Sequence, residues 1–134
     1  MLGQFQQSYL RIEVDASATA IAHSLLYRDR LQQWLSPQTL SPGLPERLSA
    51  GLTYTSRLGP VEIRHHVELA NDNHLRLILS GGIDGFHEWY WGDGWVQSRL
   101  EGVSLLPLKL AQTASLWRLK QYLTIDETGA ATSS

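Results

Sequence analysis

The chain has 134 residues, the length of one domain, and its 11 Lys and Arg against 13 Asp and Glu leave a net charge of −2 with histidine neutral. Cysteine is absent, which excludes disulfides, thiolate metal ligands and a cysteine nucleophile. A chain with this charge and no basic stripe is not expected to bind nucleic acid through its phosphates.

The N-terminal quarter predicts a strand followed by two short helices. Residues 8–14 alternate between apolar and polar, which indicates a half-buried strand. Apolar residues then recur at helical spacing after the N-cap candidates Asp15 and Ser17, and a second short helix ends before Pro37. The apolar stretch "ASATAIAHSLLY" is too short to span a bilayer, so we expect no transmembrane segment and a cytoplasmic location.

The middle of the chain is first rich in proline and then alternates between apolar and polar residues. The segment "SPQTLSPGLPERLS" (36–49) carries three prolines and one glycine, which predicts a loop without regular structure. From about residue 48 the period changes to two, and turn signals at 59–60, 71–73 and 92–94 separate strands joined as consecutive hairpins. Gly81 and Gly82 indicate a bulge or a sharp bend between two of these strands.

After Pro107 the period returns to helical, which predicts a final amphipathic helix over about residues 108–124. Such a helix must bury its apolar stripe, and the apolar face of the sheet is the available partner. The sequence therefore predicts an α+β fold: a curved antiparallel sheet of about six strands wrapped around a long C-terminal helix, with two short helices after the first strand. We expect one domain over residues 1–134, ordered over about 5–125, with 126–134 as a disordered tail.

Three segments resemble the START-like or Bet v 1-like (SRPBCC) superfamily, and within it the polyketide cyclase/dehydrase-like branch. They are "RIEVDASATAIAHSLLYRDRLQQWLSP", "GLTYTSRLGPVEIRHHVEL" and "WYWGDGWVQSRLEGVSLLPLKLAQTASLWRLKQYL". The resemblance covers about residues 5–125, with departures at Trp95, where many members have Thr, and at Ser17, where many have Pro. It implies a helix-grip fold whose cavity, between sheet and helix, holds ligands such as lipids, sterols, polyketides or hormones. It carries over no catalytic residue, because this branch shares no catalytic motif.

His65 is the sharpest single candidate for a functional residue. It lies in phase with Val61, Ile63, Val67 and Leu69, so alternation places it on the apolar face of its strand. It serves either as a cavity residue, for acid–base chemistry or ligand orientation, or as a structural histidine bonded inside the core. Adjacent histidines of a strand point to opposite faces, and no other histidine has a partner at metal-ligand spacing, so we expect no metal and no cofactor.

The stretch "GGIDGFHEWYWGDGW" (81–95) crowds aromatic residues around glycines. If Asp93-Gly94 is a two-residue turn, one inner surface pairs Trp91 with Val96, Trp89 with Ser98, and His87 with Leu100, whereas a three-residue turn changes these pairs. The two tryptophans are then either core or cavity wall, with His87 and Ser98 as polar groups beside them. The predicted cavity candidates are Tyr54, His65, His87, Trp89, Trp91, Ser98 and Trp117.

Three functions fit these patterns. The first is binding or carriage of a small hydrophobic molecule, and the second is a polyketide cyclase/dehydrase-like enzyme that uses His65 or His87 as general acid/base with Tyr54 or Ser98 as its partner. The third is a protein-interaction module without a small ligand. A large cavity lined by two or more polar groups favours the enzyme, a smooth apolar cavity favours the carrier, and a filled core favours the interaction module.

Overall fold

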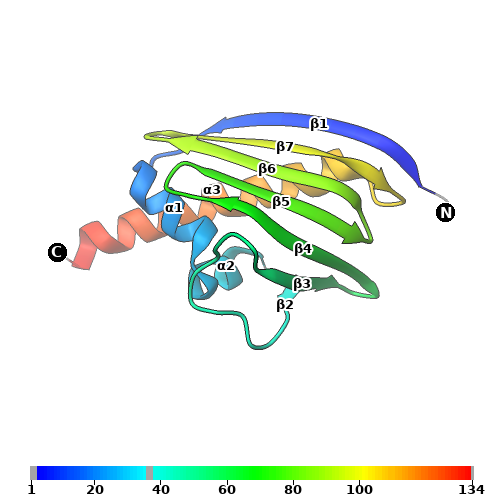
Figure 1. The fold of residues 1–134 in the computed structure, drawn as a ribbon. Helices are drawn as coiled ribbons and strands as arrows, with labels where there is room; N and C mark the ends of the chain where they lie inside the picture. The colour runs from blue at the N-terminus through cyan, green and yellow to red at the C-terminus, as the bar shows by residue number, and fades with distance from the viewer. Residues whose placement is uncertain (1–2, 36–37, 134) are drawn as a thin grey trace.

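The computed structural model describes residues 3–35 and 38–133, with side chains up to residue 124 of the last helix. The elements follow in the order β1 (Gln4–Glu13), α1 (Ala18–Leu26), α2 (Arg28–Leu35), β2 (Thr39–Leu40), β3 (Thr53–Leu58), β4 (Val61–Ala70), β5 (His74–Gly81), β6 (Asp84–Gly92), β7 (Trp95–Ser104) and α3 (Leu108–Ser133). The strands form one antiparallel sheet in the order β1-β7-β6-β5-β4-β3-β2, and α3 crosses one face of it, with α1 and α2 on the same side (Figure 1).

The predicted fold class is confirmed, with seven strands in place of about six. The additional strand is β2, which lies in the segment predicted to be irregular and pairs Thr39 with Arg57 and Leu40 with Ser56. Prolines flank these two residues but do not occupy them, so both keep the amide that a ladder requires. The free edge of β3 supplies the partner, which a local sequence pattern does not reveal.

The inner face of β4 changes phase within the strand. A bulge between Val67 and Leu69 shifts the register, so that Leu69 pairs with the outward Arg76 and Ala70 pairs with the buried Leu75. The predicted alternation therefore holds through Val67 and is wrong at Leu69, because the extra residue of a bulge moves every later side chain to the other face.

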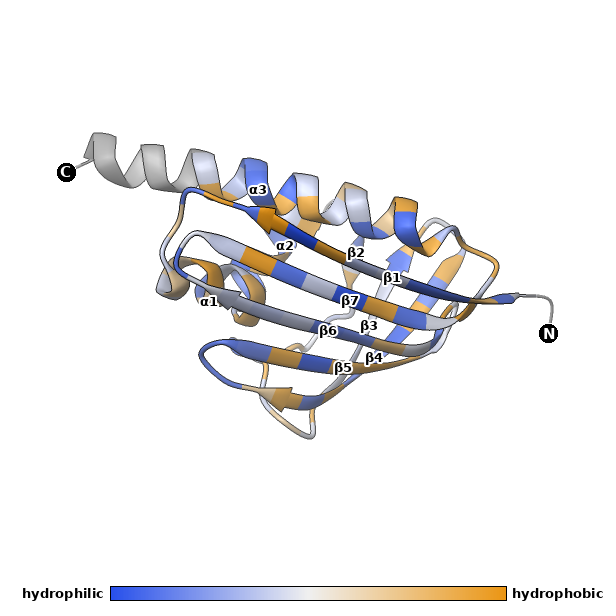
Figure 2. Ribbon diagram, turned by 90° about the horizontal axis from the view of Figure 1, so that it is seen from above, coloured by the Kyte–Doolittle hydropathy of each residue, from blue (hydrophilic) through white to orange (hydrophobic). Residues whose placement is uncertain are grey.

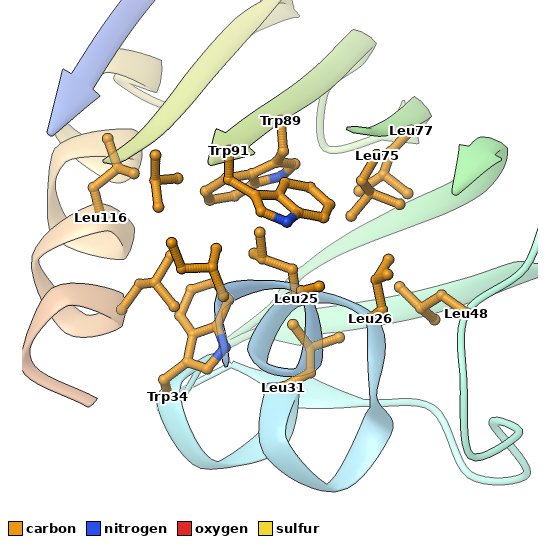
Figure 3. Close-up of a cluster of buried hydrophobic side chains, with 14 of the residues drawn as sticks. Leu25, Leu26, Leu31, Trp34, Leu48, Leu75, Leu77, Trp89, Trp91 and Leu116 are labelled. Atoms are coloured by element: carbon orange, nitrogen blue, oxygen red, sulfur yellow. The ribbon is translucent and has the colours of Figure 1, made fainter. Parts of the chain in front are cut away.

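The core lies between the sheet and the three helices. Leu108, Leu116, Leu119 and Leu123 form the buried stripe of α3, as predicted. Hydrophobic and hydrophilic residues alternate along parts of the strands (Figure 2). The buried apolar residues of the strands belong to one cluster with those of the helices. Figure 3 shows Trp89 and Trp91 pointing from the sheet toward α1 and α2, where the Trp34 ring meets Trp89 edge-on with 6.2 Å between centroids.

The backbone of α3 continues to Ser133, past the predicted end near residue 124. The disordered tail predicted for 126–134 lies outside the residues whose side chains the structure describes, and residue 134 is not described at all. The disorder of this tail therefore stays a prediction. None of the helices in the described part of the chain has the length and apolar composition that crossing a membrane requires. The cytoplasmic location likewise stays a prediction.

Candidate functional site

An interior cavity of about 110 Å³ lies between the concave face of the sheet and helices α2 and α3. Leucines and aromatic rings make up most of its wall, and within the described part of the chain no Lys, Arg, Asp or Glu contributes to it. The lining residues that matter most for chemistry are the polar ones: Gln38, Tyr54, Ser56, His65, His87, Gln112 and Ser115.

The β6–β7 hairpin fixes which side chains of the aromatic stretch face this cavity. Gly92 pairs with Trp95, so Asp93-Gly94 is a two-residue turn, and Gly94 adopts a φ of 82°, the conformation that the second central residue of a type II turn requires. The Asp93 carboxylate accepts a hydrogen bond of 2.7 Å from the backbone N–H of Ala18, which ties the turn to the first residue of α1. Of the two turn lengths that the sequence leaves open, the structure has the two-residue turn, and His87 and Trp89 face inward.

His87 belongs to a polar cluster that joins the sheet to α3. Its Nε2 lies 2.7 Å from Ser98 Oγ, across the strand pair. Ser98 Oγ and the Ser98 carbonyl each accept from Gln112 Nε2 at 3.0 Å, and the Gln112 amide also bonds Ser8 of β1. Ser98 is fully buried and Gln112 nearly so, so the cluster is shielded from solvent, with His87 and Gln112 on the cavity wall and Ser98 behind them.

His65 belongs to a second, smaller polar group on the neighbouring part of the wall. Its Nε2 lies 2.9 Å from Ser56 Oγ, and its ring stacks on Tyr54 with 4.6 Å between centroids. His65 Nδ1 is buried and has no hydrogen-bond partner among the described residues. A buried polar atom left unpaired costs about 1–3 kcal/mol, so the position carries a stability cost.

Burial controls the charge state of these side chains. Desolvation lowers the pKa of His65 to about 4. Desolvation, with a further contribution from His65, lowers the pKa of His87 to about 3. Burial also raises the pKa of the Tyr54 hydroxyl well above its ordinary value. At neutral pH all three groups are therefore uncharged, and the cavity is an electrically neutral environment.

The structure brings most of the predicted residues together and separates two from the rest. Tyr54, His65, His87 and Trp89 line the cavity, and Ser98 supports His87 from behind. Trp91 is buried in the core but does not line the cavity.

The placement of Trp117 at the cavity is wrong. Its side chain is 59% exposed, because it lies two positions before the buried Leu119 and each position along a helix turns about 100°, which places Trp117 on the outer side of α3.

Gln112 is the functional candidate that the sequence prediction missed. It lies four residues after Leu108 and four before Leu116, so the periodicity places it within the buried stripe. A polar residue in that position was the available signal, because buried amides need hydrogen-bond partners. Ser56 was also missed, although it shares a face with Tyr54.

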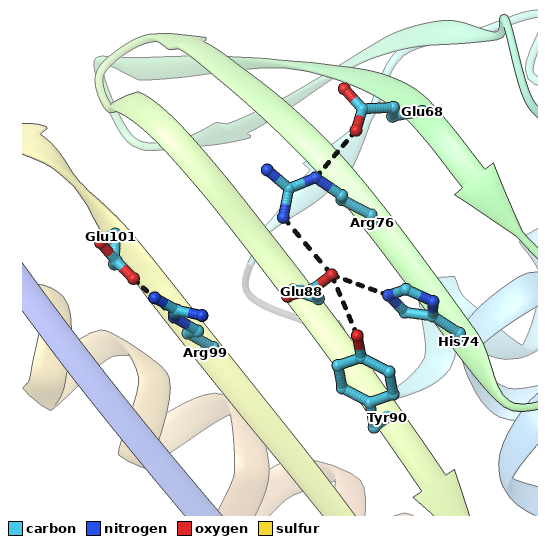
Figure 4. Close-up of polar contacts among 7 residues, drawn as sticks. All are labelled: Glu68, His74, Arg76, Glu88, Tyr90, Arg99 and Glu101. Atoms are coloured by element: carbon cyan, nitrogen blue, oxygen red, sulfur yellow. Dashed lines mark hydrogen bonds and ion pairs between the residues drawn. The ribbon is translucent and has the colours of Figure 1, made fainter.

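A second polar cluster occupies the opposite, outer face of the sheet (Figure 4). Glu88 is only 8% exposed and accepts from His74 Nε2 at 2.8 Å, and its carboxylate lies 3.3 Å from Arg76 Nη1. Burial alone would raise the pKa of Glu88, but the hydrogen bond from His74 and the charge of Arg76 outweigh it and lower the pKa. In the part of the chain that the structure describes, no three His, Asp or Glu side chains gather as a metal site requires.

Comparison with known proteins gives likeness of fold without likeness of sequence. No protein-family model matches the chain, and no curated protein matches it in sequence. Protein CV1439 from Chromobacterium violaceum has a TM-score of 0.69 at 16% identity, covering 87% of this chain and 96% of that one. The Aha1 dimer from Colwellia psychrerythraea has a TM-score of 0.64 at 16% identity, covering 88% and 96%.

DynU16, described as a putative protein in the dynemicin biosynthetic locus, has a TM-score of 0.66 at 16% identity. The match covers 88% of this chain and 47% of DynU16, so the chain spans about half the length of that protein. At these identities the likeness shows the fold alone.

Proposed function

We propose that this protein binds a small, neutral, mostly apolar molecule in the cavity between the sheet and α3, as a carrier or sensor. The observation that carries the proposal is the cavity itself, about 110 Å³ of space within an otherwise packed core. A core selected only for stability would fill it with larger side chains, so the space is best explained by an occupant.

The volume limits the size of that occupant. Ligand pockets for drug-sized molecules measure about 300–1,000 Å³, whereas an apolar cavity of about 150 Å³ holds one benzene ring. A cavity of about 110 Å³ therefore suits a single small ring or a short branched chain in this conformation. Sterols and long lipids, which the sequence resemblance suggests, would enter only if α3 and the sheet moved apart.

We infer that the chain belongs to the START-like superfamily, and two observations support this. Its sequence resembles the polyketide cyclase/dehydrase-like branch, and its fold is similar to DynU16. An enzyme of that branch is the second candidate function, favoured by the two histidines on the cavity wall. With pKa values of about 4 and about 3, His65 and His87 are weak bases and are not in the acidic imidazolium form at pH 7, so we rank binding above catalysis.

Native mass spectrometry of the protein purified from its own host tests the proposal, and we expect a bound small molecule. In addition, titration with toluene, followed by NMR, should shift the signals of Trp89 and the cavity leucines. Ser115 lines the cavity, so Ser115→Phe should block it and abolish these shifts. Ala114→Phe is the matched control, because Ala114 is similarly half-buried on the same helix but does not line the cavity.

Two results together would contradict the proposal. One is the absence of any co-purifying molecule, and the other is toluene binding that is absent or equally strong in Ser115→Phe. Toluene shifts at Trp117, on the outer side of α3, would indicate surface binding in place of cavity binding.

A further inference from the structure

We propose that His87 presents its Nδ1–H to the cavity as a fixed hydrogen-bond donor, with Ser98 and Gln112 as its positioning residues. The site therefore selects neutral ligands that carry an acceptor oxygen, such as a ketone, over hydrocarbons of the same shape. This inference rests on the proposed function and names the ligand class of the same site. It follows from three hydrogen-bond assignments, taken from the helix outward.

The first assignment is the orientation of the Gln112 amide. Gln112 Nε2 lies 3.0 Å from the Ser98 carbonyl oxygen and 3.3 Å from the Ser8 carbonyl oxygen. Both carbonyls only accept, so this end of the amide must be the NH₂ group, and the reverse orientation would place three oxygens together. The Ser8 hydroxyl then donates to Gln112 Oε1, which completes the amide.

The second assignment is the direction of the Ser98 hydroxyl. Ser98 Oγ has two partners among the described residues, Gln112 Nε2 at 3.0 Å and His87 Nε2 at 2.7 Å. The Gln112 NH₂ group offers no lone pair, so the Ser98 hydroxyl cannot donate to it and donates its proton to His87 instead. A donor that is fully buried is not left unpaired, so this direction is the stable one.

The third assignment is the tautomer of His87. Since Nε2 accepts from Ser98, the proton of the neutral ring resides on Nδ1. No described residue bonds His87 Nδ1, and this atom is not among the sealed unpaired atoms, which are His65 Nδ1, Trp91 Nε1 and Arg118 Nε. His87 lines the cavity, so its Nδ1–H is open to an occupant of that space.

The charge of the wall then selects the ligand. None of the described residues that line the cavity is Lys, Arg, Asp or Glu, so a carboxylate or an ammonium would be buried without a counter-charge. A neutral oxygen instead accepts a hydrogen bond from the free N–H of His87, so that this donor is not left unpaired. The site is therefore matched to a small ring or chain with a carbonyl or ether oxygen.

The tautomer is tested without any ligand. Long-range ¹H–¹⁵N NMR of the full chain at pH 7 reports which ring nitrogen of His87 holds the proton, and we expect Nδ1. Ser98→Ala removes the donor to Nε2 and should shift His87 toward the other tautomer. Ser56→Ala, which removes the serine bonded to His65, is the matched control and should leave the His87 signals unchanged. A protonated Nε2 in the wild-type protein would overturn the inference.

The ligand preference is tested with an isosteric pair, cyclopentanone and methylenecyclopentane, titrated against wild type and His87→Phe. The ketone-to-alkene ratio of affinities should fall about three- to tenfold in the variant, the size of one hydrogen bond. His66→Phe is the control, because His66 bonds Thr53 on the exposed face of the same sheet.

The outcomes separate the two proposals. If neither probe binds the cavity, the proposed function fails. If both bind and the ratio is unchanged in His87→Phe, the binding function stands and the inference about His87 is wrong. A fall in the ratio that His66→Phe reproduces would also refute the inference.

Discussion

Replacing Gln112 by leucine tests whether the buried polar cluster holds α3 against the sheet. The side chain is 2% exposed and bonds Ser8 of β1 and Ser98 of β7. Leucine keeps the volume but leaves the Ser8 hydroxyl without its partner, at about 1–3 kcal/mol, and removes the other hydrogen bonds at about 0.5–1.5 kcal/mol each. Better burial of leucine offsets part of this, so we expect the free energy of unfolding to fall by about 2–4 kcal/mol.

Urea denaturation at pH 7 measures this loss as a lower midpoint with an unchanged slope. Gln121→Leu, on the exposed side of the same helix, is the control and should change stability by less than about 0.5 kcal/mol. Adding Ser8→Ala to Gln112→Leu should recover about 1 kcal/mol, because both ends of one hydrogen bond are then removed. If Gln112→Leu is as stable as wild type, the cluster does not stabilise the fold.

Three further predictions concern the histidines and the helix. Burial lowers the pKa of His65 to about 4 and of His87 to about 3, so the unfolded chain binds protons that the folded chain does not. The free energy of unfolding, followed by urea denaturation, should therefore fall as pH drops from about 6.5 toward 4, by up to about 1.4 kcal/mol per pH unit for each histidine. His87→Phe should roughly halve that slope, and a slope equal to wild type would contradict it. His65→Leu combined with Ser56→Ala should keep or raise the melting temperature, because the double substitution removes both bonded partners and the unpaired Nδ1 of His65. A fall of more than about 1 kcal/mol in the free energy of unfolding would instead mark His65 as structural. Truncation before Pro107 should abolish cooperative unfolding by calorimetry, and a sharp transition near the full-length temperature would refute the role of α3.

The sequence by itself determined the elements that local patterns specify. Alternation and turn residues predicted the hairpins. They left a two- or a three-residue turn open at Asp93-Gly94, and only the pairing of Gly92 with Trp95 in the structure decided which faces His87 and Trp89 take. The leucine stripe predicted which face of α3 is buried. These features are predictable because each depends on residues close together in the chain, with periods of two or 3.6.

Tertiary structure decided the features that depend on distant partners. The bulge near Glu68 moved Leu69 to the outer face, and pairing to β3 made a strand of Thr39–Leu40. Ser8 and Gln112 lie 104 positions apart, so no local pattern shows that they meet. The cavity volume depends on how closely the side chains of α2, α3 and the sheet approach, and this follows from packing in three dimensions, which residue order alone does not specify.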